Sequence, residues 1–81
     1  MSKDAFQEYM IDSMVNLHLK LHYPRIYGYD SGVSGTYERL RDEMKYEHLI
    51  EVASNNQEWD LEEMGRQVSM KIREKTNIPI K

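Results

Sequence analysis

The chain has 81 residues and a mass of 9.7 kDa, which is enough for one small domain. A compact chain of this mass exposes roughly 5,100 Å² of surface, so it can bury one small core but has little room for a deep pocket. Its 11 basic and 14 acidic residues give a net charge of -3, which argues against a general binder of polyanions.

Hydrophobic residues make up 40% and charged residues 31% of the chain, as in soluble globular proteins. The chain has no cysteine, which excludes disulfides, thiolate metal sites and cysteine nucleophiles and fits a reducing compartment. The first residues include acids and no apolar run, so we expect neither a signal peptide nor a membrane span. The composition predicts a cytoplasmic protein with no membrane contact.

The first predicted helix covers residues 4–23. Apolar residues recur at the helical period and predict a buried stripe of Phe6, Met10, Met14, Leu17 and Leu21, widened by Ile11 and Val15. Pro24 disfavours helical backbone at Tyr23 and ends the helix there. A strand-like alternation from Leu17 to Tyr23 competes with this interpretation, but the stripe from Phe6 continues in phase. A helix leaves Leu19 exposed.

The second predicted helix covers residues 36–54 and carries two apolar stripes. One contains Tyr37, Leu40, Met44, His48 and Val52, and the other contains Tyr46, Leu49, Ile50 and Ala53. Two stripes indicate either a central helix between two neighbours, or a helix that touches one neighbour and a second protein chain. Residues 24–35, with Gly28, Gly32 and Gly35, are predicted to form a long loop before this helix.

The third predicted helix begins at Asp60 and has the strongest local signal. Asp60 and Glu63 form a capping box, and Trp59 and Met64 occupy the two staple positions around it. A narrow stripe follows, made of Leu61, Met64, Val68 and Ile72. Gly65 beside the stripe predicts a close approach of another helix, and Asn77 and Pro79 end the helix. The predicted fold is therefore all-α, a small three-helix bundle with a long Tyr/Gly-rich loop, in one domain spanning residues 1–81.

The loop region concentrates the candidate binding residues, which are Tyr23, Arg25, Tyr27, Tyr29 and Tyr37. Tyrosine and arginine are enriched among the residues that anchor protein interfaces. Two interpretations stay open: the rings cover the small core, or at least two of them point outward and bind a partner. We also expect self-association through Leu19, Tyr46 and Ile50, because the second stripe and the exposed leucine need cover.

Other chemistries have weaker signals. His18 and His22 share a helix face at the i, i+4 spacing of a zinc ligand pair, but buried or interface histidines are the commoner case, and we predict no metal. The glycines of the loop lack both phosphate-binding spacings. Acidic residues near Asp60 complement the dipole of the helix that follows. No set of residues fits catalytic roles, so we predict neither an enzyme nor a cofactor.

The sequence thus predicts a non-enzymatic module that binds another protein, as an adaptor or inhibitor, and that self-associates. Six methionines supply adaptable apolar surface for such a role. The alternative is a three-helix nucleic-acid-binding protein, favoured by the basic residues of the last helix, which are Arg66, Lys71, Arg73 and Lys75. The acids at the start of that helix and the long turn before it count against DNA recognition.

Overall fold

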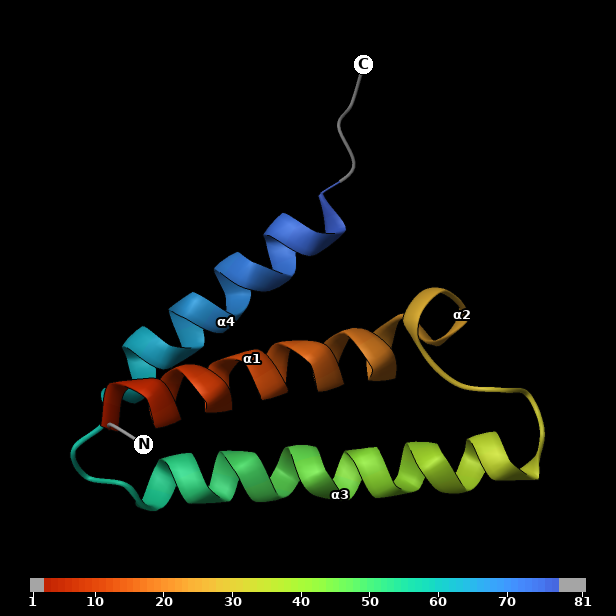
Figure 1. Ribbon diagram of the computed structural model, residues 1–81, viewed down its shortest axis with the longest axis horizontal. Coiled ribbons are helices and arrows are strands. Elements are labelled where there is room, and N and C mark those ends of the chain that lie inside the picture. The colour runs from red at the N-terminus through yellow and green to blue at the C-terminus, as the bar shows by residue number, and fades with distance from the viewer. Residues whose placement is uncertain (1–2, 78–81) are drawn as a thin grey trace.

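The computed structural model describes residues 3–77, and 84% of the described residues are helical, with no strand among them. The prediction of an all-helical fold is confirmed. The helices are α1 (Lys3–His22), α2 (Pro24–Tyr27), α3 (Val33–Asn55) and α4 (Leu61–Thr76) (Figure 1). The three long helices α1, α3 and α4 match the three predicted helices. The segment predicted to be a loop contains an additional short helix, α2.

The central helix of the fold is α1, because both α3 and α4 pack against it (Figure 1). The interpretation of the second predicted helix as the central one, between two neighbours, is therefore wrong. Two neighbours demand a wide buried arc on α1, and the buried residues are Met10, Ile11, Val15 and Leu19. The arc is rotated away from the predicted stripe, so that Phe6 is exposed and Leu19 is 3% exposed. The prediction of an exposed Leu19 is wrong.

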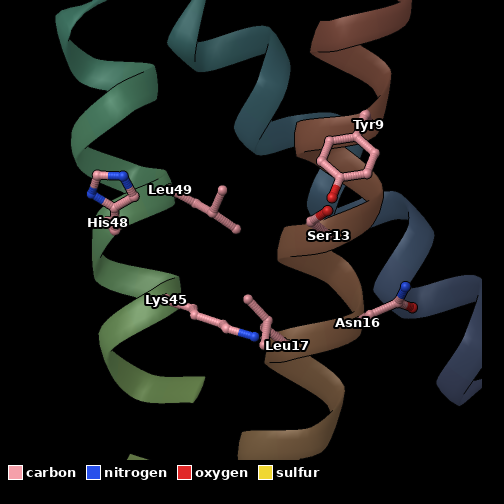
Figure 2. A pocket seen from close by; sticks show the side chains of 7 residues that line it. All are labelled: Tyr9, Ser13, Asn16, Leu17, Lys45, His48 and Leu49. Carbon is pink, nitrogen blue, oxygen red and sulfur yellow. The ribbon is translucent and has the colours of Figure 1, made fainter. Parts of the chain in front are cut away.

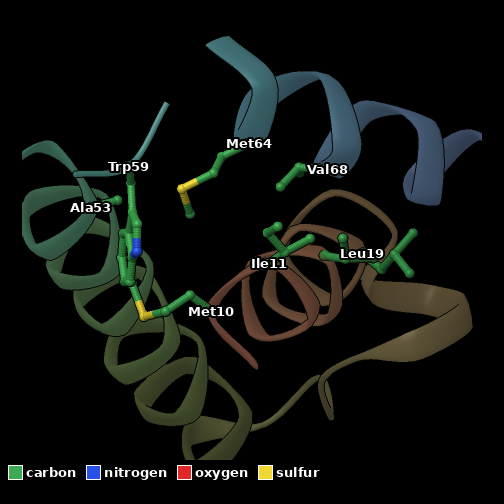
Figure 3. Packing of buried hydrophobic residues seen from close by; sticks show 8 residues of the cluster. Met10, Ile11, Leu19, Ala53, Trp59, Met64 and Val68 are labelled. Atoms are coloured by element: carbon green, nitrogen blue, oxygen red, sulfur yellow. The ribbon is translucent and has the colours of Figure 1, made fainter. Parts of the chain in front are cut away.

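The core lies where the three long helices meet. Trp59 stands beside Met10 of α1 and Ala53 of α3, while Met64 and Val68 of α4 lie over α1 (Figure 3). The ring of Phe6 lies 5.6 Å from that of Trp59, centroid to centroid. The core therefore extends along α1 from Met10 to Leu19, and Trp59 and Ala53 close it where α3 ends and α4 begins.

The start of α4 shows the Asp60 half of the predicted capping box, whereas the carboxylate of Glu63 accepts hydrogen bonds from Arg66 and Gln67. The side chain of Asp60 accepts a hydrogen bond from the backbone N–H of Glu63 at 3.2 Å, and both Trp59 and Met64 are buried. The prediction for Gly65 is wrong: a Cβ placed there would have no neighbour within 4 Å. The helix ends at Thr76, before Asn77, whereas Pro79 lies outside the described residues.

The segment predicted to be a loop contains a helical turn because Pro24 occupies the first position of α2. Proline fixes a helical φ and needs no hydrogen bond at that position. The turn closes through the bond from the N–H of Gly28 to the carbonyl of Pro24 at 3.1 Å. The chain then crosses the start of α3, and Gly35 is needed there because a Cβ would lie 1.8 Å from the carbonyl oxygen of Asp30.

The arrangement is open. The radius of gyration of 14.2 Å exceeds the roughly 12 Å expected of a compact chain of this length. α4 diverges from α3 on the far side of α1 (Figure 1). Within residues 3–77 no helix has both the length and the hydropathy needed to cross a membrane. Large apolar side chains remain exposed, and their distribution points to the candidate site.

Candidate protein-interaction surface

The inward face of the first half of α3 is polar. Asp42 is only 2% exposed, and its Oδ2 accepts a hydrogen bond from Lys20 Nζ at 2.8 Å. The same Lys20 nitrogen lies 3.2 Å from Oε1 of Glu38. The start of α3 therefore contacts α1 through charged groups, whereas its last turns contact α1 through apolar ones.

Tyr29 completes this polar contact. Its hydroxyl donates a hydrogen bond to Asp42 Oδ2 at 2.7 Å, and Lys20 Nζ lies 4.9 Å from the centre of its ring. Burial, and then the bond to Asp42, raise the pKa of Tyr29 to about 12. Burial alone would raise the pKa of Asp42, but the bonds from Lys20 and Tyr29 hold it below its usual value. Tyr29 thus points inward, which agrees with the interpretation of a ring that covers the fold, and its role in partner binding stays a prediction.

The opposite face of the same half-helix is apolar and exposed. It carries Val33, Tyr37, Leu40 and Met44, which we call the outer stripe. The exposed fractions of these residues are 73%, 70%, 52% and 71%. They follow one another at spacings of four, three and four residues, so they form a single line on a helix. At about 100° per residue, this line lies roughly half a turn from Asp42. No described element covers it.

A groove between α1 and α3 extends this surface. Its volume is about 380 Å³, and it is lined by Tyr9, Ser13, Asn16, Leu17, Lys45, His48 and Leu49 (Figure 2). Lys45 and His48 also line the shallow hollow beside the outer stripe, so the groove and the hollow are neighbours. Tyr9 stands at the rim and is 60% exposed. A partner bound to the outer stripe would therefore also contact the groove.

The other predicted binding residues lie in or next to α2. The rings of Tyr23 and Tyr27 meet edge to face at 6.5 Å, and the Tyr27 hydroxyl donates a hydrogen bond to the carbonyl of Lys75 at 3.4 Å. Arg25 is exposed beside Ile26, which is 74% exposed. The structure thus divides the five predicted residues: three lie around α2, Tyr29 points inward, and Tyr37 belongs to the outer stripe.

The residues predicted to self-associate do not share a surface. Leu19 is buried in the core, which excludes it from any contact with a second chain. Tyr46 is half-buried, with its ring 6.3 Å from that of His18 on α1. Only Ile50 is open to solvent, at 42%. The prediction was wrong for Leu19 because the buried arc of α1 is rotated relative to the stripe that its apolar periodicity indicates.

The histidine pair of α1 and the basic residues of α4 add little to the candidate interaction surface. The rings of His18 and His22 lie 4.1 Å apart, and burial together with the charge of His22 lowers the pKa of His18. Among the described residues, no group of three or more His, Cys, Asp or Glu could hold a metal ion. On α4, Arg66 binds Glu63, and Lys71 Nζ lies 2.7 Å from Asp12 Oδ1, so acids offset part of the basic face.

Sequence reasoning placed Tyr37, Leu40 and Met44 on one stripe of this helix, but it left Val33 in the preceding loop and did not show which stripe faces outward. The missed signal is the pair Glu38 and Asp42. These two acids are four residues apart, so they share one face of the helix, and that face lies opposite the outer stripe. Such a pair can face inward when a lysine such as Lys20 is available to neutralise it. Comparisons with family models, with curated proteins and with solved structures found no match for this chain. Its function is therefore inferred from its own residues.

Proposed function

We propose that this chain is a non-enzymatic protein-interaction module, an adaptor or inhibitor, and that it binds its partner through the outer stripe of α3. The observation that carries the proposal is the exposed line of four large apolar residues on a helix whose other face is held against α1. Contiguous apolar surface of this kind marks interaction sites in soluble proteins. Tyrosine and methionine suit such a surface, since one supplies a large ring and the other an adaptable chain.

The form of the surface favours a helical partner. A straight line of side chains at spacings of three and four matches the way an amphipathic helix is recognised, by anchors on successive turns. The groove beside Lys45 and His48 gives the partner a second row of contacts against α1. The alternative, nucleic-acid binding, has less support, because Lys71 and Arg66 are engaged by acids and the net charge is -3.

Site-specific photocrosslinking tests the proposal. A photoreactive amino acid is placed at Met44 in one variant and at Met70 in another, in cells that express the protein. Both methionines are exposed on helices, at 71% and 54%, but only Met44 belongs to the outer stripe. We expect Met44 to crosslink to polypeptide and Met70 to do so far less. Equal, background-level crosslinking from both positions contradicts the proposal, and crosslinks to nucleic acid support the alternative.

A further inference from the structure

We propose that His18 and His22 of α1 form a proton-sensitive contact, which loosens the attachment of α1 to the first half of α3 as the pH falls below neutrality. This contact acts on the fold and is independent of the proposed function. The two rings lie 4.1 Å apart, centroid to centroid, with their planes inclined by 31°. The stack tolerates one charged ring, but it brings two positive charges together when both rings are protonated. Histidine is the side chain that ordinarily changes its charge between pH 5 and 8.

The pair lies at the junction of α1 with α3. The ring of Tyr46, which is half-buried on α3, lies 6.3 Å from the ring of His18. His18 is itself half-buried, whereas His22 is exposed in the last turn of α1, where the helix dipole favours a positive charge. A second proton must therefore enter the partly buried ring of His18, beside a charged neighbour.

The elements next to the pair bring it bases rather than free acids. On α2, Arg25 lines the hollow that His22 also lines. On α3, Arg39 donates a hydrogen bond to the carbonyl of Leu21, the residue before His22, at 3.3 Å. The acid one turn further along α3 is Glu43, and its Oε1 lies 3.5 Å from Nε of Arg39. This acid is therefore already engaged by a permanent cation.

The charged contacts between α4 and α1 lie on another side of α1. Lys71 Nζ lies 2.7 Å from Asp12 Oδ1, and Lys75 Nζ lies 3.4 Å from the amide oxygen of Asn16. At about 100° per residue, Asp12 lies about 120° around α1 from His18. These contacts therefore do not neutralise a proton on His18.

The pKa of His18 agrees with this arrangement. Burial first, and then the charge of His22, lower it from its ordinary value of 6.5, and neither cause is an acid that would hold the proton. Below pH 6.5 the folded chain therefore binds fewer protons than the unfolded chain. The contribution of His18 to stability is complete above pH 6.5 and is lost as the pH falls through the lower pKa of the folded chain.

The proton acts on the turns of α1 that hold the first half of α3. Lys20, two residues after His18, binds Glu38 and Asp42 at 3.2 Å and 2.8 Å. Despite its burial, Asp42 has a pKa below its usual value because Lys20 and Tyr29 bind it, so it stays ionised in mild acid. Repulsion at His18 therefore separates the two helices next to a polar contact that water can replace. The hydrophobic core includes no histidine and stays closed.

Urea unfolding tests the contribution between about pH 7.5 and about pH 5, above the range in which most carboxylates titrate. We expect acidification to raise the unfolding equilibrium constant of the wild-type chain about threefold or more, and to raise that of His18→Gln less. His48→Gln is the matched control, because it removes an exposed imidazole of α3 and leaves the pair intact. It should retain the wild-type response. A response that His18→Gln leaves unchanged, or that His48→Gln abolishes, overturns the proposal.

Proton NMR of the folded chain gives a second test, which does not depend on the folding of His18→Gln. The Cε1 proton of His18 should titrate below pH 6.5 in the wild-type chain. His22→Gln removes the neighbouring charge and should move this titration to higher pH. A His18 titration that His22→Gln leaves in place overturns the coupling of the two rings.

Hydrogen exchange locates the loosened contact. Protection factors, which correct for the effect of pH on exchange chemistry, should fall on acidification for amides around Tyr46 and change less around Ala53, which lies in the core. His18→Gln should abolish this difference. An equal loss of protection at both places overturns a local release of the first half of α3.

Discussion

The hydroxyl of Tyr29 donates a hydrogen bond to Oδ2 of Asp42 over 2.7 Å, and this bond ties the segment after α2 to the inward face of α3. The same carboxylate also binds Lys20 of α1. One nearly buried acid therefore joins three parts of the chain, although 13 residues separate it from Tyr29 and 22 from Lys20.

Replacement of Tyr29 tests the weight of this bond. Tyr29→Phe keeps the ring and removes the donor, so Asp42 loses one of its two hydrogen bonds and keeps the groups of Lys20 and Arg41 that lie within 3.9 Å. We expect the free energy of unfolding to fall by about 1–2 kcal/mol, the usual cost of leaving a buried acceptor short of a bond. Urea unfolding measures it. Tyr27→Phe is the control, because the Tyr27 bond is long and exposed, and its change should stay within about 0.5 kcal/mol.

Alkaline pH should weaken the fold through the same tyrosine. Folding raises the pKa of Tyr29 from 10.0 to about 12, first through burial and then through Asp42. Between those values the folded chain binds more protons than the unfolded one, so this contribution is complete below pH 10 and is lost as the pH rises toward 12. Unfolding midpoints of wild type and Tyr29→Phe should converge over this window. Parallel curves would contradict the assignment.

Two glycines should respond in opposite ways to alanine. Gly35→Ala places a Cβ 1.8 Å from the carbonyl oxygen of Asp30, so backbone must move and stability should fall by about 1–3 kcal/mol. Gly65→Ala adds a Cβ with nothing within 4 Å in the body of α4, and should stabilise the chain by about 0.5–1 kcal/mol. Thermal melting of the two variants checks the prediction, which fails if both change stability in the same direction.

The start of α4 offers a graded test. Asp60→Ala removes the cap on the Glu63 N–H and should cost about 1 kcal/mol. Trp59→Ala empties part of the core between α1 and α3 and should cost about 3–5 kcal/mol. Chemical denaturation gives both values. If the order were reversed, Trp59 would not be the core residue that its 6% exposure indicates.

The parts of the fold that the sequence predicts well are those that depend on neighbouring residues. The cap and staple around Asp60 involve positions five residues apart at most, so their chemistry is visible in the sequence. The positions of the long helices follow from apolar periodicity in the same way. Pro24 shows the limit of local rules, because the residue that ends α1 also begins α2.

The parts that could not be predicted depend on which helix covers which side. Leu19 is buried because two helices pack against α1. The apolar periodicity of α1 indicates only one packing neighbour. Asp42 faces inward because Lys20 and Tyr29 neutralise and bind it, and neither partner can be identified from spacing. The candidate site shares this difficulty. Residue type alone makes Tyr37 a candidate, whereas Leu40 and Met44 are marked only by the polar inward face of α3, which places them on the outer side.

The uneven distribution of apolar contacts along α3 has a consequence for local unfolding. The buried residues of this helix are Gly35, Asp42 and Ala53, and only the last of them belongs to the hydrophobic core. The first half of α3 can therefore detach from α1 by exchanging polar contacts for water, while the core around Trp59 stays closed. Amide hydrogens near Leu40 should exchange with solvent sooner than those near Ala53. Because this half also carries the outer stripe, an occupant would slow that exchange, and binding could be followed there backbone amide by backbone amide.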